Sequence, residues 1–374
     1  MIDAMASELH LASVPSLIDL MRQPQRMRDL SLKQWDVVLR LARSANLLGR
    51  LAQAAAALDL LEQLPPQLAR HLLATQRLTQ HQQEAIEWEC RHLELALGGL
   101  QVRLVLLKGA AYAMSGHPAA KGRLFGDVDL LVPRAALNAA EAALMLHGWS
   151  TGAIDPYDQR YYRRWMHELP PMVSLKRGTV VDVHHNILPL TSRHVPDAAA
   201  LLAASVPLAG TCFHVLAPCD MVIHSATHLF HEGELKNGLR DLYDLDSLLM
   251  SFASSEPQFW RRLRERAQEL GLVWPVYLAL RYTHAVLGSA VPAEAMSSAR
   301  ALAGLGSIRE YCFDAMYLRA FSPDHPLVNR PSHGLARAAL YLRAHALRMP
   351  VWRLCLHLGR KGWLRLFKHS SRSG

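Results

Sequence analysis

The stretch Asp127-Val128-Asp129-Leu130-Leu131-Val132 constrains the fold of this 374-residue chain more than any other. Its apolar end has the composition of a strand, and successive strand side chains point to opposite faces, so the two aspartates share one face. Carboxylates held side by side repel each other, and inside a sheet that repulsion is poorly screened. A cation between the two groups relieves it. The stretch therefore predicts a strand with a cation-binding site at its start.

A third acid strengthens the expectation of a metal site. Asp182 lies in the β-branched run Thr179-Val180-Val181-Asp182-Val183-His184, where Asp182 and His184 share one face. Hard divalent cations such as Mg²⁺ take oxygen ligands, commonly carboxylates together with substrate phosphates. Three carboxylates from two adjacent strands can hold two such ions about 4 Å apart. In that arrangement one ion activates the attacking oxygen and the other steadies a leaving pyrophosphate, so the acids point to phosphoryl or nucleotidyl chemistry.

Two further segments are candidates for phosphate contacts. The apolar run Val102-Arg103-Leu104-Val105-Leu106-Leu107 predicts a strand that ends at Lys108-Gly109. A glycine at a strand-to-helix turn lets the backbone approach a phosphate, and Lys108 adds a point charge. Arg123 can add a bidentate fork. His184 is a candidate for contact with a phosphate or the acceptor, and a structural role for it is equally consistent.

The pattern along the chain divides it into four regions. Residues 1–98 read as helices, 99–195 as a small α/β core, 196–324 as helices again, and 325–374 as a basic amphipathic segment. Within the core we expect strands from Val102, from Asp127, at Met172–Leu175 and at Thr179–Val183, with a helix at Ala135–His147. The sequence therefore predicts an α+β fold in which a small mixed sheet is flanked by N- and C-terminal helical regions.

The net charge of +9 is concentrated at one end of the chain. Residues 325–374 contain ten Lys and Arg and no Asp or Glu, so the rest of the chain is close to neutral. Such a basic amphipathic segment can pack on the body of the protein with its charges in solvent. It can also lie on an anionic membrane surface or contact nucleic acid, and the sequence leaves all three alternatives open.

Composition indicates a globular chain in a reducing compartment. Hydrophobic residues make up 51% and charged residues 20%, and no apolar run approaches the roughly 18 residues of a membrane-spanning helix. The five cysteines form no CxxC pair, and the acidic start Met1–Glu8 lacks a signal-peptide core. These features favour a cytoplasmic location.

Three histidines share a helical face after Pro218. His224, His228 and His231 follow i, i+4, i+7 spacing, which is compatible with metal ligation, with lining a substrate cleft, or with a plain structural role. No carboxylate lies within that stretch.

The order of these motifs resembles a known family. The run Leu106-Leu107-Lys108-Gly109, then the strand Arg123-x-x-x-Asp127-x-Asp129-Leu-Leu-Val, then Val181-Asp182-Val183-His184 is similar to the uncharacterised bacterial nucleotidyltransferases of the DNA polymerase beta-like superfamily. The resemblance covers residues 102–190 best. It implies that Asp127, Asp129 and Asp182 bind metal and that the Lys108-Gly109 turn faces a nucleoside triphosphate. One departure is Ala110, where the superfamily has a serine that supplies a hydroxyl contact.

The combined prediction is a Mg²⁺-dependent nucleotidyltransferase with two metal ions. It would move a nucleoside monophosphate from a nucleoside triphosphate to the hydroxyl group of an unidentified sugar, lipid or protein acceptor. The alternative, which the missing serine favours, is a non-catalytic nucleotide-sensing or partner-binding protein on the same fold. The sequence selects neither the acceptor, nor the nucleotide, nor an oligomeric state.

Overall fold

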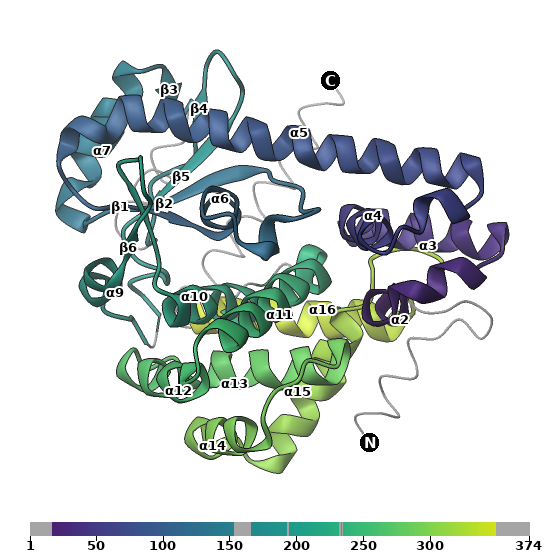
Figure 1. The fold of residues 1–374 in the computed structure, drawn as a ribbon. Helices are drawn as coiled ribbons and strands as arrows, with labels where there is room; N and C mark the ends of the chain where they lie inside the picture. The colour runs from purple at the N-terminus through teal and green to yellow at the C-terminus, as the bar shows by residue number, and fades with distance from the viewer. Residues whose placement is uncertain (1–16, 153–165, 193, 232, 234, 349–374) are drawn as a thin grey trace, which may run out of the picture.

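A single mixed sheet with helices around it forms the centre of the protein (Figure 1). The computed structural model describes residues 17–152, 166–192, 194–231, 233 and 235–348. The observed α+β architecture confirms the predicted fold class, a small mixed sheet with helical flanks.

Seven strands make up the sheet, in the order β3-β4-β5-β2-β1-β7-β6. Their bounds are β1 (Leu104–Leu107), β2 (Asp127–Leu131), β3 (Trp149–Ser150), β4 (Met172–Ser174), β5 (Val180–His184), β6 (Val206–Pro207) and β7 (Phe213–Val215). Strand β2 pairs antiparallel with β1 and parallel with β5, so the strand carrying the two aspartates lies in the middle. All four residues of β1 are buried, as a central strand requires.

The sheet extends beyond the segment in which strands were predicted. Strands β6 and β7 lie after residue 195, in the region that the sequence pattern assigned to helices. Strand β7 pairs parallel with β1, from Leu104↔Phe213 to Leu106↔Val215. The four strands predicted from the sequence correspond to β1, β2, β4 and β5.

The helices that border strands in the sequence include α5 (Pro66–Leu97), α6 (Lys108–Met114), α7 (Leu137–Leu146) and α9 (Ala198–Ala204). Helix α5 begins at a proline in its first turn, where the missing N–H costs nothing. It contacts α6 and α7 at one end and α4 (Leu48–Ala57) at the other, and so joins the sheet to the N-terminal helices (Figure 1).

The remaining helices form the two flanks. On the N-terminal side these are α2 (Leu17–Arg22) and α3 (Leu32–Ser44), and on the C-terminal side α10 (Pro218–His231), α11 (Gly238–Ser255), α12 (Phe259–Glu269), α13 (Val273–Tyr282), α14 (Ala293–Ala303), α15 (Ser307–Ala320) and α16 (Pro331–Arg348). Short helical turns connect them: η1 (Pro24–Asp29), η2 (Leu61–Gln63), η3 (Gly98–Leu100), η4 (Pro118–Ala120), η5 (Arg134–Ala136), η6 (Leu235–Asn237) and η7 (Thr283–Leu287).

The part of the basic C-terminal segment that the structure describes packs on the body. Helix α16 contacts α15 and α10, and Leu340 and Ala344 are buried. Arg343 donates to the carbonyl oxygen of Phe230 at 3.0 Å, and its guanidinium lies 4.6 Å from the centre of the Trp274 ring. Residues 349–374 lie outside the described residues. Within the described part of the chain, no helix is long and apolar enough to cross a membrane.

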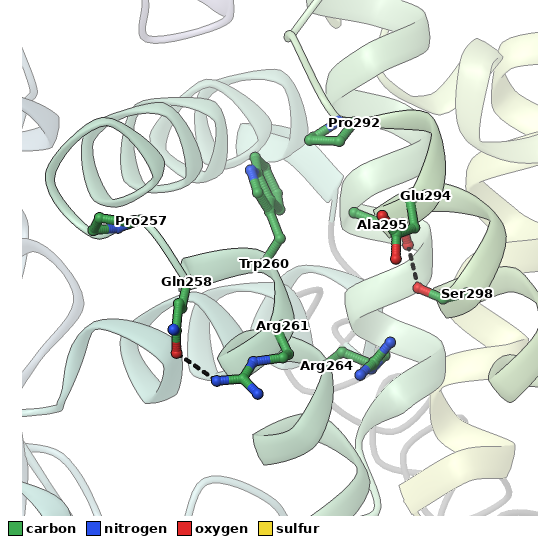
Figure 2. A pocket seen from close by; sticks show the side chains of 9 residues that line it. All are labelled: Pro257, Gln258, Trp260, Arg261, Arg264, Pro292, Glu294, Ala295 and Ser298. Carbon is green, nitrogen blue, oxygen red and sulfur yellow. Dashed lines mark hydrogen bonds between the residues drawn. The ribbon is translucent and has the colours of Figure 1, made fainter.

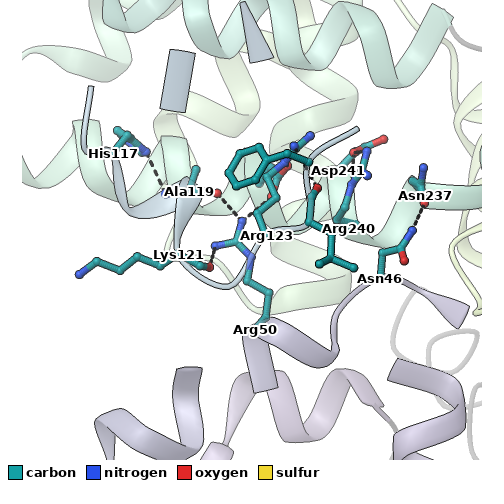
Figure 3. Close-up of polar contacts among 12 residues, drawn as sticks. Asn46, Arg50, His117, Ala119, Lys121, Arg123, Asn237, Arg240 and Asp241 are labelled. Carbon is teal, nitrogen blue, oxygen red and sulfur yellow. Dashed lines mark hydrogen bonds and ion pairs between the residues drawn. The ribbon is translucent and has the colours of Figure 1, made fainter. Parts of the chain in front are cut away.

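A buried ion-pair network ties the N-terminal helices to the segment before β2. Arg50 on α4 donates to the carbonyl oxygens of Ala119 and Lys121, each at 2.5 Å (Figure 3). The same guanidinium donates to Asp244 on α11 at 2.6 Å. Asp244 also accepts from Arg123 at 2.8 Å. The loop that leads into β2 is therefore held from two sides.

Candidate functional site

The parallel pairing of β2 and β5 brings the three aspartates to one face of the sheet. The register sets Asp129 opposite Asp182 and Asp127 opposite Val180. Side chains of directly paired residues point to the same face, and residues two apart along a strand do so as well. Asp127 is exposed, Asp182 is half-buried, and Asp129 is buried with 3% of its surface exposed. The three acids therefore run from the surface into the protein along one face.

The three carboxyl groups differ in charge. Burial would raise the pKa of Asp129, but the Lys108 ammonium and the hydrogen bond from His184 outweigh it and hold that pKa well below its usual range. Burial, followed by the charge of Asp129, raises the pKa of Asp182 to about 7. Desolvation of the Asp127 carboxyl by the protein around it, followed by the charge of Asp129, raises the pKa of Asp127. Asp129 is thus a fixed anion, and its two neighbours take up protons more readily.

Lys108 follows β1 at the turn into α6 and reaches Asp129. Its Nζ lies 2.7 Å from Asp129 Oδ1. Its backbone has φ of 45°, in the left-handed region that non-glycine residues rarely adopt and that is often retained at functional sites. The strained turn aims the ammonium at the acidic face.

Gly109 and Arg123 lie against each other beside this turn. A Cβ on Gly109 would collide with the Arg123 guanidinium and come within 3.0 Å of Phe125 Cδ1, so only glycine fits. Arg123 itself is 8% exposed and is paired with Asp244. The structure gives Arg123 a role in holding the turn, and its predicted phosphate contact stays a prediction.

His184 bridges two carboxylates. Its Nε2 lies 3.0 Å from Asp129 Oδ1 and its Nδ1 lies 3.2 Å from Glu168 Oε2. Burial would lower the pKa of His184, but its hydrogen bond to Asp129 and the charge of Glu168 produce a net rise. Glu168 was not predicted from the sequence. It reaches His184 through an isolated antiparallel bridge between the two residues, for which no motif spacing gives a signal.

Residues 31–288 match the family described as uncharacterised nucleotidyltransferase. The chain belongs to this family. The match spans more than half of the chain and includes all seven strands and the three aspartates. A search of curated proteins found no match. The general activity of the family is nucleotidyl transfer, with a nucleoside triphosphate as substrate, and nucleotidyltransferases generally use divalent metal ions.

The aspartates of this family member fit a divalent metal ion in their chemistry. All three offer carboxylate oxygens, the ligands that Mg²⁺ prefers. Asp182 Oδ1 is buried and has no hydrogen-bond partner, a costly arrangement that a bound cation removes. Asp129 Oδ1 is already contacted by Lys108 and His184. In the described part of the chain, the three aspartates do not form a group whose ligand atoms all lie within 4.8 Å of one another.

The histidines on α10 of this family member differ from one another. His224 is 4% exposed, and burial, followed by the charge of Lys108, lowers its pKa to about 3, so its imidazole is neutral beside the site. The Nδ1 of His231 lies 3.1 Å from the carbonyl oxygen of Thr227, and its ring packs on Trp274. Among the described residues, His224, His228 and His231 form no group of metal ligands. For all three histidines, lining of a substrate cleft and a structural role stay hypotheses.

A separate hollow of about 420 Å³ opens at the beginnings of α12 and α14 (Figure 2). Its lining contains none of the sheet residues that carry the acidic face. The residues are Pro257, Gln258, Trp260, Arg261, Arg264, Pro292, Glu294, Ala295 and Ser298.

Proposed function

We propose that the chain is a Mg²⁺-dependent nucleotidyltransferase in which Asp127, Asp129 and Asp182 hold two metal ions. The observation that carries this proposal is the pairing of Asp129 with Asp182 on adjacent parallel strands, with a buried Asp182 oxygen that has no hydrogen-bond partner. Family membership supports nucleotidyl transfer as the class of reaction. The metal, its number and the residues that hold it are the content of the proposal.

The proposed reaction exchanges one bond to phosphorus for another. The oxygen of an acceptor hydroxyl forms a bond to the α-phosphorus of the triphosphate, the bond to the pyrophosphate oxygen breaks, and the hydroxyl proton passes to a base. When bound, the ions neutralise phosphate charge and make the attacking hydroxyl more acidic. The aspartates position them. Lys108, held 2.7 Å from Asp129, supplies a protein cation at the phosphates.

A double substitution tests the metal assignment. Asp127→Asn together with Asp129→Asn removes two negative charges while keeping the side-chain shapes, so Mg²⁺-dependent binding of nucleoside triphosphates should be lost in calorimetry. Asp36→Asn, at a 60% exposed side chain on α3, is the matched control and should bind as the wild type does. Unchanged nucleotide affinity in the folded double variant would sink the assignment.

A second candidate function is non-catalytic nucleotide sensing on the same fold. It is favoured by the Lys108–Asp129 ion pair, since a protein ammonium already neutralises the most buried acid. Ala110, in place of a serine, points the same way. A screen for pyrophosphate release with each triphosphate and a range of sugar, lipid and protein acceptors separates the two. Binding with turnover supports the enzyme, and tight binding without turnover supports the sensor.

Two further hypotheses concern the location of the chain and its partners. We keep a cytoplasmic location, and contact of residues 325–374 with a membrane surface or nucleic acid, as hypotheses. The packing of α16 against α15 and α10 supports the other alternative from the sequence, a segment packed on the body of the protein, for residues 331–348.

A further inference from the structure

A cluster of nitrogen and oxygen ligands lies beside the three aspartates, and the proposed reaction does not use it. His167, Glu168 and His184 each offer one ligand atom, and these atoms lie within 4.8 Å of one another. His184 is buried and the other two are half-buried. Within the residues that the structure describes, these three form the group of His, Cys, Asp or Glu side chains close enough together to hold one metal ion.

The backbone holds the cluster in place. Glu168 and His184 face each other across an antiparallel bridge. On either side of it, His185 N donates to His167 O at 2.7 Å and Leu169 N donates to Val183 O at 2.8 Å. The imidazole rings of His167 and His184 have centres 5.3 Å apart. Ligands on backbone segments that are hydrogen-bonded to each other lose little freedom when an ion binds, which favours a preformed site.

The hydrogen bonds of His184 leave a place for a cation. Asp129 Oδ1, 3.0 Å from Nε2, can only accept, so Nε2 carries the proton. In the neutral tautomer, Nδ1 then presents its lone pair to Glu168 Oε2 at a distance of 3.2 Å. Two acceptors at that distance repel each other unless a cation shares them. A second proton on the imidazole relieves that repulsion, and so does a metal ion bound to both atoms.

The outer contacts of the cluster match those of metal-binding histidines. A histidine that binds a metal through one ring nitrogen commonly donates its other N–H to a carboxylate, which fixes the ring and its tautomer. Asp129 holds that position for His184. Two imidazole nitrogens and one carboxylate oxygen suit Zn²⁺ and neighbouring transition metals, whereas Mg²⁺ prefers oxygen alone.

We propose that His167, Glu168 and His184 form a binding site for a divalent transition-metal ion such as Zn²⁺, separate from the three aspartates. The ion binds His184 through Nδ1 and leaves Nε2–H on Asp129. It therefore fixes the orientation of the most buried acid of the neighbouring site. The inference goes beyond the proposed nucleotidyl transfer and does not depend on it.

Cobalt provides a spectroscopic test on the full chain. The protein is freed of metal with a chelator and titrated with Co²⁺, which absorbs visible light strongly when protein nitrogen and oxygen atoms bind it in a low-coordinate site. We expect one equivalent of Co²⁺ to bind at micromolar concentration and Zn²⁺ to displace it. Glu168→Gln and His167→Ala should each weaken binding at least tenfold. Exposed His147→Ala is the matched control and should bind as the wild type does.

Two further results decide the assignment. Asp127→Asn should keep the cobalt spectrum even where it abolishes Mg²⁺-dependent nucleotide binding, so that the two proposals fail or stand separately. Circular dichroism checks that each variant is folded, and the nearly isosteric Glu168→Gln guards against a trivial loss of structure. No cobalt spectrum in the wild type, or equal affinity in folded Glu168→Gln and His167→Ala, overturns the metal site and makes His184 a doubly protonated bridge between Asp129 and Glu168.

Discussion

Asp244→Asn should destabilise the protein far more than the loss of an ordinary acid. The Asp244 carboxylate accepts from Arg50 at 2.6 Å and from Arg123 at 2.8 Å. The three side chains are 3%, 4% and 10% exposed in the order Asp244, Arg50 and Arg123. Water therefore cannot solvate the arginine charges that the substitution leaves without their anion. The network also joins α4, the loop before β2 and α11, so its failure affects all three.

The expected cost follows from this burial. Removing one partner of a buried ion pair leaves an uncompensated charge and costs about 3–5 kcal/mol. Asparagine keeps one oxygen that can accept a hydrogen bond, so we expect a loss near the lower end, about 3 kcal/mol, in the free energy of unfolding. The exposed pair Asp36–Arg40 on α3, with side chains 60% and 57% exposed, provides the contrast. For Asp36→Asn we expect a loss of about 0.3–0.5 kcal/mol.

Equilibrium unfolding in urea, followed by tryptophan fluorescence and circular dichroism, measures both losses. The slope of unfolding free energy against urea concentration should be the same in the wild type, Asp244→Asn and Asp36→Asn. Differences between their unfolding midpoints then report differences in stability. If Asp244→Asn loses less than about 1 kcal/mol, the pairing of Arg50 and Arg123 contributes little and the reasoning from burial is wrong. Equal losses in the two variants refute it as well.

Two further substitutions test the turn and the acidic face. Gly109→Ala should lower the free energy of unfolding by about 1–3 kcal/mol in the same assay, because the new Cβ would collide with Arg123. The control is Gly126→Ala, where no atom lies within 4 Å of the new Cβ, and it should stay near the wild type. Similar losses in the two variants would contradict the collision. Asp182 has its pKa raised from 3.8 to about 7, so without divalent metal the folded chain holds a proton that the unfolded chain releases. Stability should then fall as the pH rises from about 4 to 7, and Asp182→Asn should remove this fall; parallel pH curves for the two proteins would exclude it.

The sequence predicts the acidic strands because their signals are local. Asp127–Leu131 and Val180–His184 are apolar or β-branched runs whose alternation assigns each side chain to a face, and the observed register agrees with those faces. Strand β7, with three residues, carries too little pattern for prediction. It exists because β1 offers a parallel partner across more than 100 residues of sequence, which is a tertiary effect.

The partners of the charged residues were not predictable for the same reason. Arg123 and Asp244 are 121 positions apart, and nothing in the sequence distinguishes an arginine that will pair with a buried acid from one that will meet a phosphate. Glu168 is a similar case. Its position opposite His184 depends on an antiparallel bridge formed before β4, and the surrounding residues show no alternation that reveals it.

The three aspartates of the acidic face differ in their electrostatic surroundings. Asp129 is the deepest of the three aspartates, and the protein supplies its cations, the Lys108 ammonium and the His184 N–H, so its charge does not depend on a ligand. Burial is the main reason that the pKa values of Asp127 and Asp182 are raised, and the charge of Asp129 adds to both rises. A cation arriving between the strands lowers both pKa values and releases protons, because ligand carboxylates must be ionised. If the proposed cation binds on this face, its affinity should therefore rise with pH as Asp127 and Asp182 ionise, while Asp129 is ionised throughout.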